Sequence, residues 1–147
     1  MPCCREWFCL PFSNPVATSR TPLLTRSSAQ GWHITLGYPR WKLSYPVVAN
    51  LRQLAPTREM LHIGDASIFE EMYRSRLDEL GVGGVRKLLT DCAERANNEH
   101  LLALCYEDLT KPGLSCHRRL FAAWFQENTG EAVPELQPAV RQGQLFL

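Results

Sequence analysis

Residues Leu101 to Tyr106 form an uninterrupted apolar run, LLALCY. A short run of this kind is typical of a strand that is covered on both faces, as the central strands of parallel sheets are. It is far shorter than the roughly 20 residues that a membrane-spanning helix requires. We therefore expect these residues to form the central strand of the protein.

Four other segments carry the pattern of strands. Trp7–Phe12 is a short aromatic run before a turn, and Trp32–Leu36 alternates in polarity. Met60–Ile63 predicts a short third strand, and Val133–Leu136 predicts an edge segment. Residues 15–30 are rich in Ser, Thr and Pro and show little periodicity, so they predict a long loop.

Apolar residues at helical spacing predict helices between these strands. The expected helices run from Pro46 to Pro56, from Ser67 to a stop at Gly81, from Val85 to Asn97-Asn98, and from Ser115 to Asn128-Thr129-Gly130. Ser67, with Glu70 three residues later, and Ser115 are the expected N-caps. Because strands alternate with helices, the sequence predicts one α/β domain over residues 1–147, with a mostly parallel sheet flanked by helices.

Charge and composition narrow the classes of partner. The chain has 147 residues, 45% of them hydrophobic, and the longest apolar runs are short and interrupted, so we expect no contact with a membrane. A net charge of +1 argues against a dedicated nucleic-acid carrier. Residues 1–60 hold seven basic and two acidic groups, which leaves a nucleic acid open as a weaker alternative partner. The oligomeric state is not indicated.

The six cysteines favour free thiols over metal ligands. The start Met1-Pro2-Cys3-Cys4 lacks the pattern of a secretory signal, so we expect a cytoplasmic protein with reduced cysteines. Cys3, Cys4 and Cys9 cluster, but the chain has no Cys-x-x-Cys pair and no His pair at ligand spacing. The sequence therefore predicts no metal site and leaves the role of the clustered thiols open.

One segment carries the candidate chemistry. Cys116, His117 and Arg118 lie at the expected start of a helix, where the positive end of the helix dipole favours a thiolate. Cys105 lies near the end of the predicted central strand and Glu107 follows that strand directly. The two side chains share one side of the strand if the chain stays extended. In open α/β sheets ligands bind at this edge. We assign Cys116 as a nucleophile, His117 as a proton donor or acceptor, Glu107 as the orienting group and Arg118 as an anion clamp.

Two further residues supplement this cleft. Arg40 follows the second predicted strand and contacts an anion in this interpretation; the alternative, which we favour, is an exposed arginine in a rigid turn. Tyr73 lies on an apolar helix face, which favours a place in the core, and in the ligand-binding interpretation its hydroxyl reaches the cleft. No cofactor is expected, because Gly81-Val82-Gly83-Gly84 lacks the Lys-Ser/Thr of a phosphate-binding loop. The leading function is the binding of a small anionic or nucleotide-like ligand, with thiol-dependent chemistry left open.

The alternative is a structural role for the same residues. Glu107 pairs with Arg118 or Arg119 to fasten the loop to the helix, Cys116 packs as a small apolar residue, and His117 caps the helix or is solvated. The protein is then a non-catalytic interaction module with a nucleic-acid or protein partner.

The motifs also resemble a known family. Cys105-Tyr106-Glu107 followed by Cys116-His117-Arg118 resembles the bacterial domain-of-unknown-function family 488, whose members end in a Cys-x-Glu strand and a Cys-His-Arg helix start. Further likeness to one branch lies in Phe12-Ser13-Asn14, in Ile34 to Arg40, in Leu54-Ala55-Pro56, in the Phe69 to Tyr73 spacing, and in Ala123-Trp124 through Val133 to Leu136. The resemblance implies a cytosolic α/β domain with a shared site and no assigned substrate. The Cys-rich start departs from the family pattern.

Overall fold

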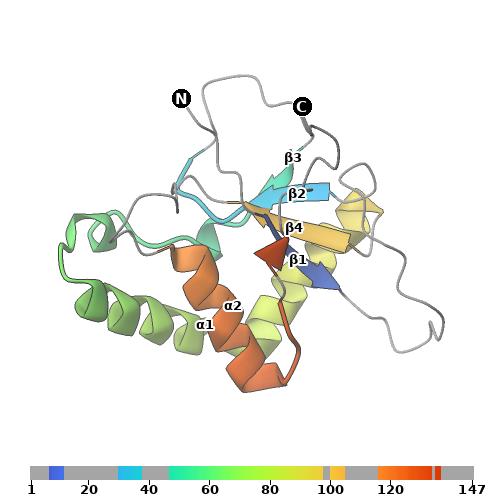
Figure 1. Cartoon of the computed structure of the whole chain (residues 1–147). Coiled ribbons are helices and arrows are strands. Elements are labelled where there is room, and N and C mark those ends of the chain that lie inside the picture. Colours follow the sequence, from blue (N-terminus) through green and yellow to red (C-terminus); the bar gives the residue numbers. More distant parts are fainter. Residues whose placement is uncertain are drawn as a thin grey trace, which may run out of the picture.

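The computed structural model describes residues 7–11, 30–37, 47–97, 100–104, 116–133 and 135–136. Its two long elements are α1 (Ala66–Ala96) and α2 (His117–Thr129), and two short 3-10 turns, η1 (Arg52–Leu54) and η2 (Met60–His62), precede α1. The strands are β1 (Trp7–Pro11), β2 (Gln30–His33), β3 (Val47–Asn50), β4 (His100–Leu104) and β5 (Glu135–Leu136). Figure 1 shows α2 beside α1, with the strands above them.

The predicted fold class, a mostly parallel sheet flanked by helices, is wrong. Most of the described chain is helical, and no strand exceeds five residues. The strands pair in the order β3-β2-β4-β1-β5, with β2 parallel to β3 and β4, and β1 antiparallel to β4 and β5. Two of the four pairings are thus antiparallel. The sequence pattern located strands, but the direction of a pairing depends on contacts between segments far apart in the chain.

The core lies between the helices and one side of the strands. Leu101 and Ala103, two residues apart on β4, belong to the same buried cluster as Ala49 of β3. The helices contribute the larger buried side chains, which are Tyr73, Leu77, Val85 and Leu89 from α1 and Phe121, Trp124 and Phe125 from α2. This shared core sets the position of α2, and with it the position of the Cys-His-Arg motif.

Two predicted elements between Pro46 and Ile63 are wrong. The expected helix over Pro46–Pro56 is β3 followed by η1, because the β-branched pair Val47-Val48 favours a strand and a helix of that length is marginal alone. The expected strand Met60–Ile63 is the turn η2. The Thr57 hydroxyl accepts a hydrogen bond from the Met60 amide at 3.3 Å, which favours a turn over an extended chain.

The N-cap of α1 is Asp65, two residues before the expected Ser67. Its carboxylate accepts hydrogen bonds from the backbone amides of Ser67 at 2.8 Å and Ile68 at 3.1 Å. A carboxylate at this place also interacts favourably with the positive end of the helix dipole. Glu70, expected to complete a capping box, instead pairs with Arg74 at 3.0 Å.

The predicted break at Gly81 is confirmed. Helix α1 extends from Ala66 to Ala96, but Gly81 within it has φ 68° and ψ 164°, which is not a helical conformation. Gly81 therefore divides α1 into two segments. The expected end of the second segment is also found, with Asn97 as a left-handed C-cap.

We expect Gly81→Ala to destabilise the protein by about 1–3 kcal/mol, because that combination of φ and ψ is essentially restricted to glycine. Gly83→Ala is the matched control: Gly83 is exposed and helical, and a methyl group there meets nothing within 4 Å. It is expected to stabilise by up to about 1 kcal/mol. Urea unfolding of both variants checks the opposite signs, and a stabilised Gly81→Ala contradicts the break.

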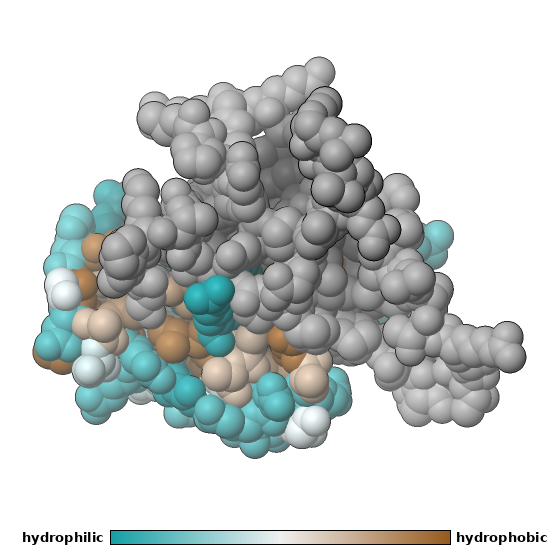
Figure 2. All heavy atoms as spheres, in the orientation of Figure 1, coloured by the Kyte–Doolittle hydropathy of each residue, from teal (hydrophilic) through white to brown (hydrophobic). Residues whose placement is uncertain are grey.

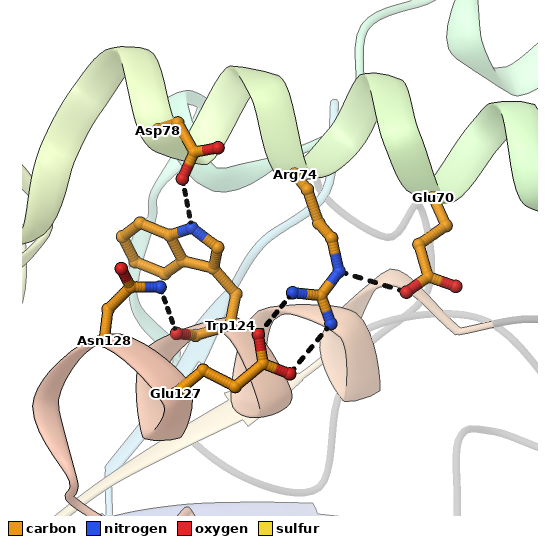
Figure 3. Close-up of polar contacts among 6 residues, drawn as sticks. All are labelled: Glu70, Arg74, Asp78, Trp124, Glu127 and Asn128. Carbon is orange, nitrogen blue, oxygen red and sulfur yellow. Dashed lines mark hydrogen bonds and ion pairs between the residues drawn. The ribbon is translucent and has the colours of Figure 1, made fainter.

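A polar seam joins the first segment of α1 to α2 (Figure 3). Arg74 donates to Glu127 at 2.6 and 3.1 Å, and the Trp124 indole donates to Asp78 at 2.6 Å. The hydrogen bonds to Glu127 raise the pKa of Arg74, and the same contact lowers the pKa of the Glu127 carboxyl. The seam fixes the rotation of α2 against α1 along the edge of their shared core.

Candidate functional site at the start of α2

Four of the predicted site residues lie in the described part of the chain: Tyr73, Cys116, His117 and Arg118. Three others, Glu107, Arg40 and Cys105, lie outside the described residues, as does almost all of the loop predicted over residues 15–30. The structure therefore places the Cys-His-Arg motif and Tyr73, and the remaining assignments stay predictions.

Cys116 is the N-cap residue of α2, with an extended backbone at φ −104° and ψ 118°. The prediction that Ser115 caps the helix is therefore wrong by one residue, and the first helical turn begins at His117. The Cys116 carbonyl accepts from the amides of Arg119 at 2.9 Å and Leu120 at 3.3 Å. Its side chain is 2% exposed and makes no capping hydrogen bond.

His117 joins the start of α2 to the chain directly after β2. Its Nε2 atom lies 2.7 Å from the carbonyl oxygen of Ile34. Because a carbonyl oxygen only accepts, Nε2 carries a proton and donates it, so this nitrogen is committed to a structural hydrogen bond. The contact spans 83 positions of the sequence and is buried.

Tyr73 packs against the same histidine from α1. The two rings meet edge to face, with centroids 5.8 Å apart and an interplanar angle of 76°. The Tyr73 hydroxyl donates to the carbonyl oxygen of Leu54 at 2.6 Å. Tyr73 is fully buried in the core, and its hydroxyl bonds to the backbone of the η1 turn.

Arg118 is 1% exposed and follows His117 in the first turn of α2. That turn contains no acidic residue and has Arg119 as its third member. The amino end of a helix carries a positive partial charge and normally favours Asp or Glu. The motif therefore concentrates positive charge where both burial and the helix dipole oppose it.

Two features of this region were not found by sequence reasoning. The backbone carbonyls of Ile34 and Leu54 anchor His117 and Tyr73, and no side-chain pattern identifies such partners. Asn50, at the end of β3, has both amide atoms buried without a hydrogen-bond partner. It falls in the segment that the sequence predicted as a helix.

The described residues offer neither a metal site nor a membrane span. No group of three or more His, Cys, Asp or Glu side chains among them is arranged to hold a metal ion. Neither α1 nor any other described helix combines the length and apolar character needed to cross a bilayer.

Comparisons with protein-family models, with curated proteins and with solved structures find no match for this chain, so the resemblance to family 488 stays a prediction from the motifs.

Proposed function

We propose that the protein binds a small anionic ligand, such as the phosphate group of a nucleotide-like molecule, at the amino end of α2. The observation that supports the proposal is a first helical turn that begins with His117 and Arg118 and holds no acidic residue. An anion at this place interacts favourably with the guanidinium and with the positive end of the helix dipole. Arg118 is the anion clamp, because its planar fork matches phosphate and carboxylate oxygens.

His117 acts in this proposal as a positioning residue. Its Nε2 proton is held by the Ile34 carbonyl, and the Tyr73 ring supports the imidazole from the side. This fixed histidine keeps the first turn of α2 in place, so the backbone amides of the turn keep their direction toward the ligand.

Burial does not separate binding from thiol chemistry, because Cys116 is 2% exposed and Arg118 is 1% exposed. Binding is proposed because the guanidinium and the amino end of α2 both attract an anion. Neither Cys116 nor Cys92 is in a disulfide, and burial raises the pKa of the Cys92 thiol. Free thiols are usual in a reducing compartment, which supports a cytoplasmic location as part of the proposal.

The test is thermal unfolding in inorganic phosphate, with sodium chloride at matched ionic strength as the control. At ten times its dissociation constant a ligand stabilises by about 1.4 kcal/mol, which is roughly 3–6 °C in Tm for a chain of this size. We expect that shift in the wild type and in Arg119→Gln, whose exposed side chain is the neighbour of Arg118. Arg118→Lys keeps the charge but loses the planar fork, so we expect less than half of the shift.

A second candidate function, the structural latch of an interaction module, is favoured by the buried hydrogen bond from His117 to Ile34. The same experiment distinguishes the two candidate functions. If phosphate stabilises no more than chloride does, while Arg118→Met lowers Tm in either salt, the buried arginine is a latch and ligand binding is excluded.

A further inference from the structure

The first segment of α1 has a face that its core contacts do not use. Tyr73 and Leu77 point into the core, and Arg74 and Asp78 face α2. The remaining stripe, at helical spacings of three and four, consists of Ile68, Glu71, Met72, Ser75 and Glu79, all of them exposed. A helix face that is exposed and partly apolar is a candidate surface for another molecule.

This stripe forms one wall of a groove, and the other wall is the turn around η2. The groove has a volume of about 370 Å³, and Met60 and Met72 lie in it with Glu71 and Glu79. Two exposed apolar residues neighbour these methionines in the chain: Leu61, which follows Met60, is 53% exposed, and Ile68, one helical turn before Met72, is 51% exposed. Figure 2 shows apolar atoms among hydrophilic ones at the left end of the molecule, where η2 and the start of α1 lie in Figure 1.

The charges of the groove are negative overall. Glu71 and Glu79 form no ion pair with another described residue, whereas Glu70 and Asp91 of the same helix are paired. Arg76 also lines the groove, but its guanidinium is held at the η1 turn by the backbone carbonyls of Ala55 and Arg52 at 3.0 and 3.4 Å. The groove therefore holds the carboxylates of Glu71 and Glu79 and a single guanidinium, that of Arg76, which is bonded to backbone carbonyls.

We propose that this groove docks an amphipathic helix of a partner protein, with basic side chains on either side of a large apolar one. Glu71 and Glu79 are eight residues apart, which is roughly 12 Å along a helix. A partner helix with Lys or Arg at positions i and i+8 matches this separation and places residue i+4 over Ser75, with Met72 about one helical turn away on the same face. Methionines adapt to apolar side chains of different shapes, as in other grooves that bind helices.

The negative charge of the groove favours a basic helix over two other occupants, a second copy of this chain and an anionic membrane. A second copy of the chain that used the same face would bring Glu71 and Glu79 against the same carboxylates, which a symmetric interface disfavours. A membrane with anionic lipids is repelled by the same side chains. A basic partner helix has neither cost, and its attraction to the groove weakens as salt is added.

The test uses a fluorescein-labelled helical peptide of about 18 residues, with lysines at i and i+8 and leucine at i+4, and fluorescence anisotropy as the readout. The control peptide has glutamates in place of the lysines. We expect saturable binding of the basic peptide alone. The double variant Glu71→Lys/Glu79→Lys is expected to weaken it by about tenfold or more and to bind the acidic peptide instead.

Glu94→Lys, an exposed charge reversal on the second segment of α1, is the matched control and should change the affinity less than about twofold. Met72→Asp tests the apolar part and is expected to weaken the basic peptide by about tenfold. The proposal is overturned if the basic peptide does not saturate below about 1 mM or if Glu94→Lys weakens it as much as the double variant does. A wild-type dimer that Met72→Asp dissociates, or binding to phosphatidylserine vesicles, overturns it as well.

Discussion

Replacing Phe125 by alanine is expected to lower the free energy of unfolding by about 3–5 kcal/mol. Phe125 is 1% exposed in the middle of α2. Its ring lies 5.9 Å from the Phe121 ring, and the Arg86 guanidinium of α1 lies 5.6 Å above it. The substitution therefore removes apolar burial and a cation–π contact between α1 and α2, and an aromatic pair within α2.

The measurement is urea unfolding, with two matched variants on the same helix. Phe125→Leu keeps most of the apolar volume and is expected to lose less than about 1.5 kcal/mol, which leaves a folded protein to measure. Gln126→Ala changes an exposed neighbour and should stay within about 0.5 kcal/mol of the wild type. A loss below about 1 kcal/mol in Phe125→Ala contradicts the packing of α2 on α1, and with it the position of the candidate site.

Local signals in the sequence predicted the two long helices, including the break in α1 and its C-terminal end. The break at Gly81 and the C-cap at Asn97 are set by the residues themselves, because the φ and ψ of Gly81 are essentially restricted to glycine and asparagine tolerates the left-handed conformation of a C-cap. The segment predicted as the central strand, Leu101–Tyr106, overlaps β4, which lies third of five in the observed order. Each of these features depends on neighbours in the chain.

The architecture could not be predicted in the same way. The antiparallel pairing of Phe8 with Ala103 and the parallel pairing of Trp32 with the same residue join segments that are far apart in the sequence. A short apolar pattern does not indicate which way its partner runs. Val47, Val48, Leu51 and Leu54 fit the spacing of a helix, but a segment with so few apolar residues fits the alternation of a strand equally well.

The candidate site shows the same division. The position of His117 and Arg118 in a first helical turn was predictable from the motif, and so was the helix face that carries Tyr73. Their burial was not, because it depends on how α2 packs against α1 and on the chain after β2. A cluster of basic residues at a predicted helix start is a signal of an anion site that can be seen in the sequence, because such residues oppose the helix dipole.

His117→Ala is expected to lower the free energy of unfolding by about 2–4 kcal/mol. It removes the hydrogen bond to the carbonyl of Ile34, a fully buried residue, and it opens a cavity beside the Tyr73 ring. His117→Gln places an amide N–H donor near the position of Nε2, so we expect it to recover about 1 kcal/mol or more of the loss.

A double-mutant cycle with Tyr73→Leu identifies what His117 contributes to this joint. The edge-to-face contact predicts a coupling of about 0.5–1.5 kcal/mol between the two rings, which a histidine that only fills space does not produce. Because the proposed anion site needs the first turn of α2 in its present place, His117→Ala should also reduce the shift in Tm caused by phosphate. If His117→Ala costs less than about 1 kcal/mol and leaves that shift intact, the imidazole does not hold the turn, and Arg118 alone must account for anion binding.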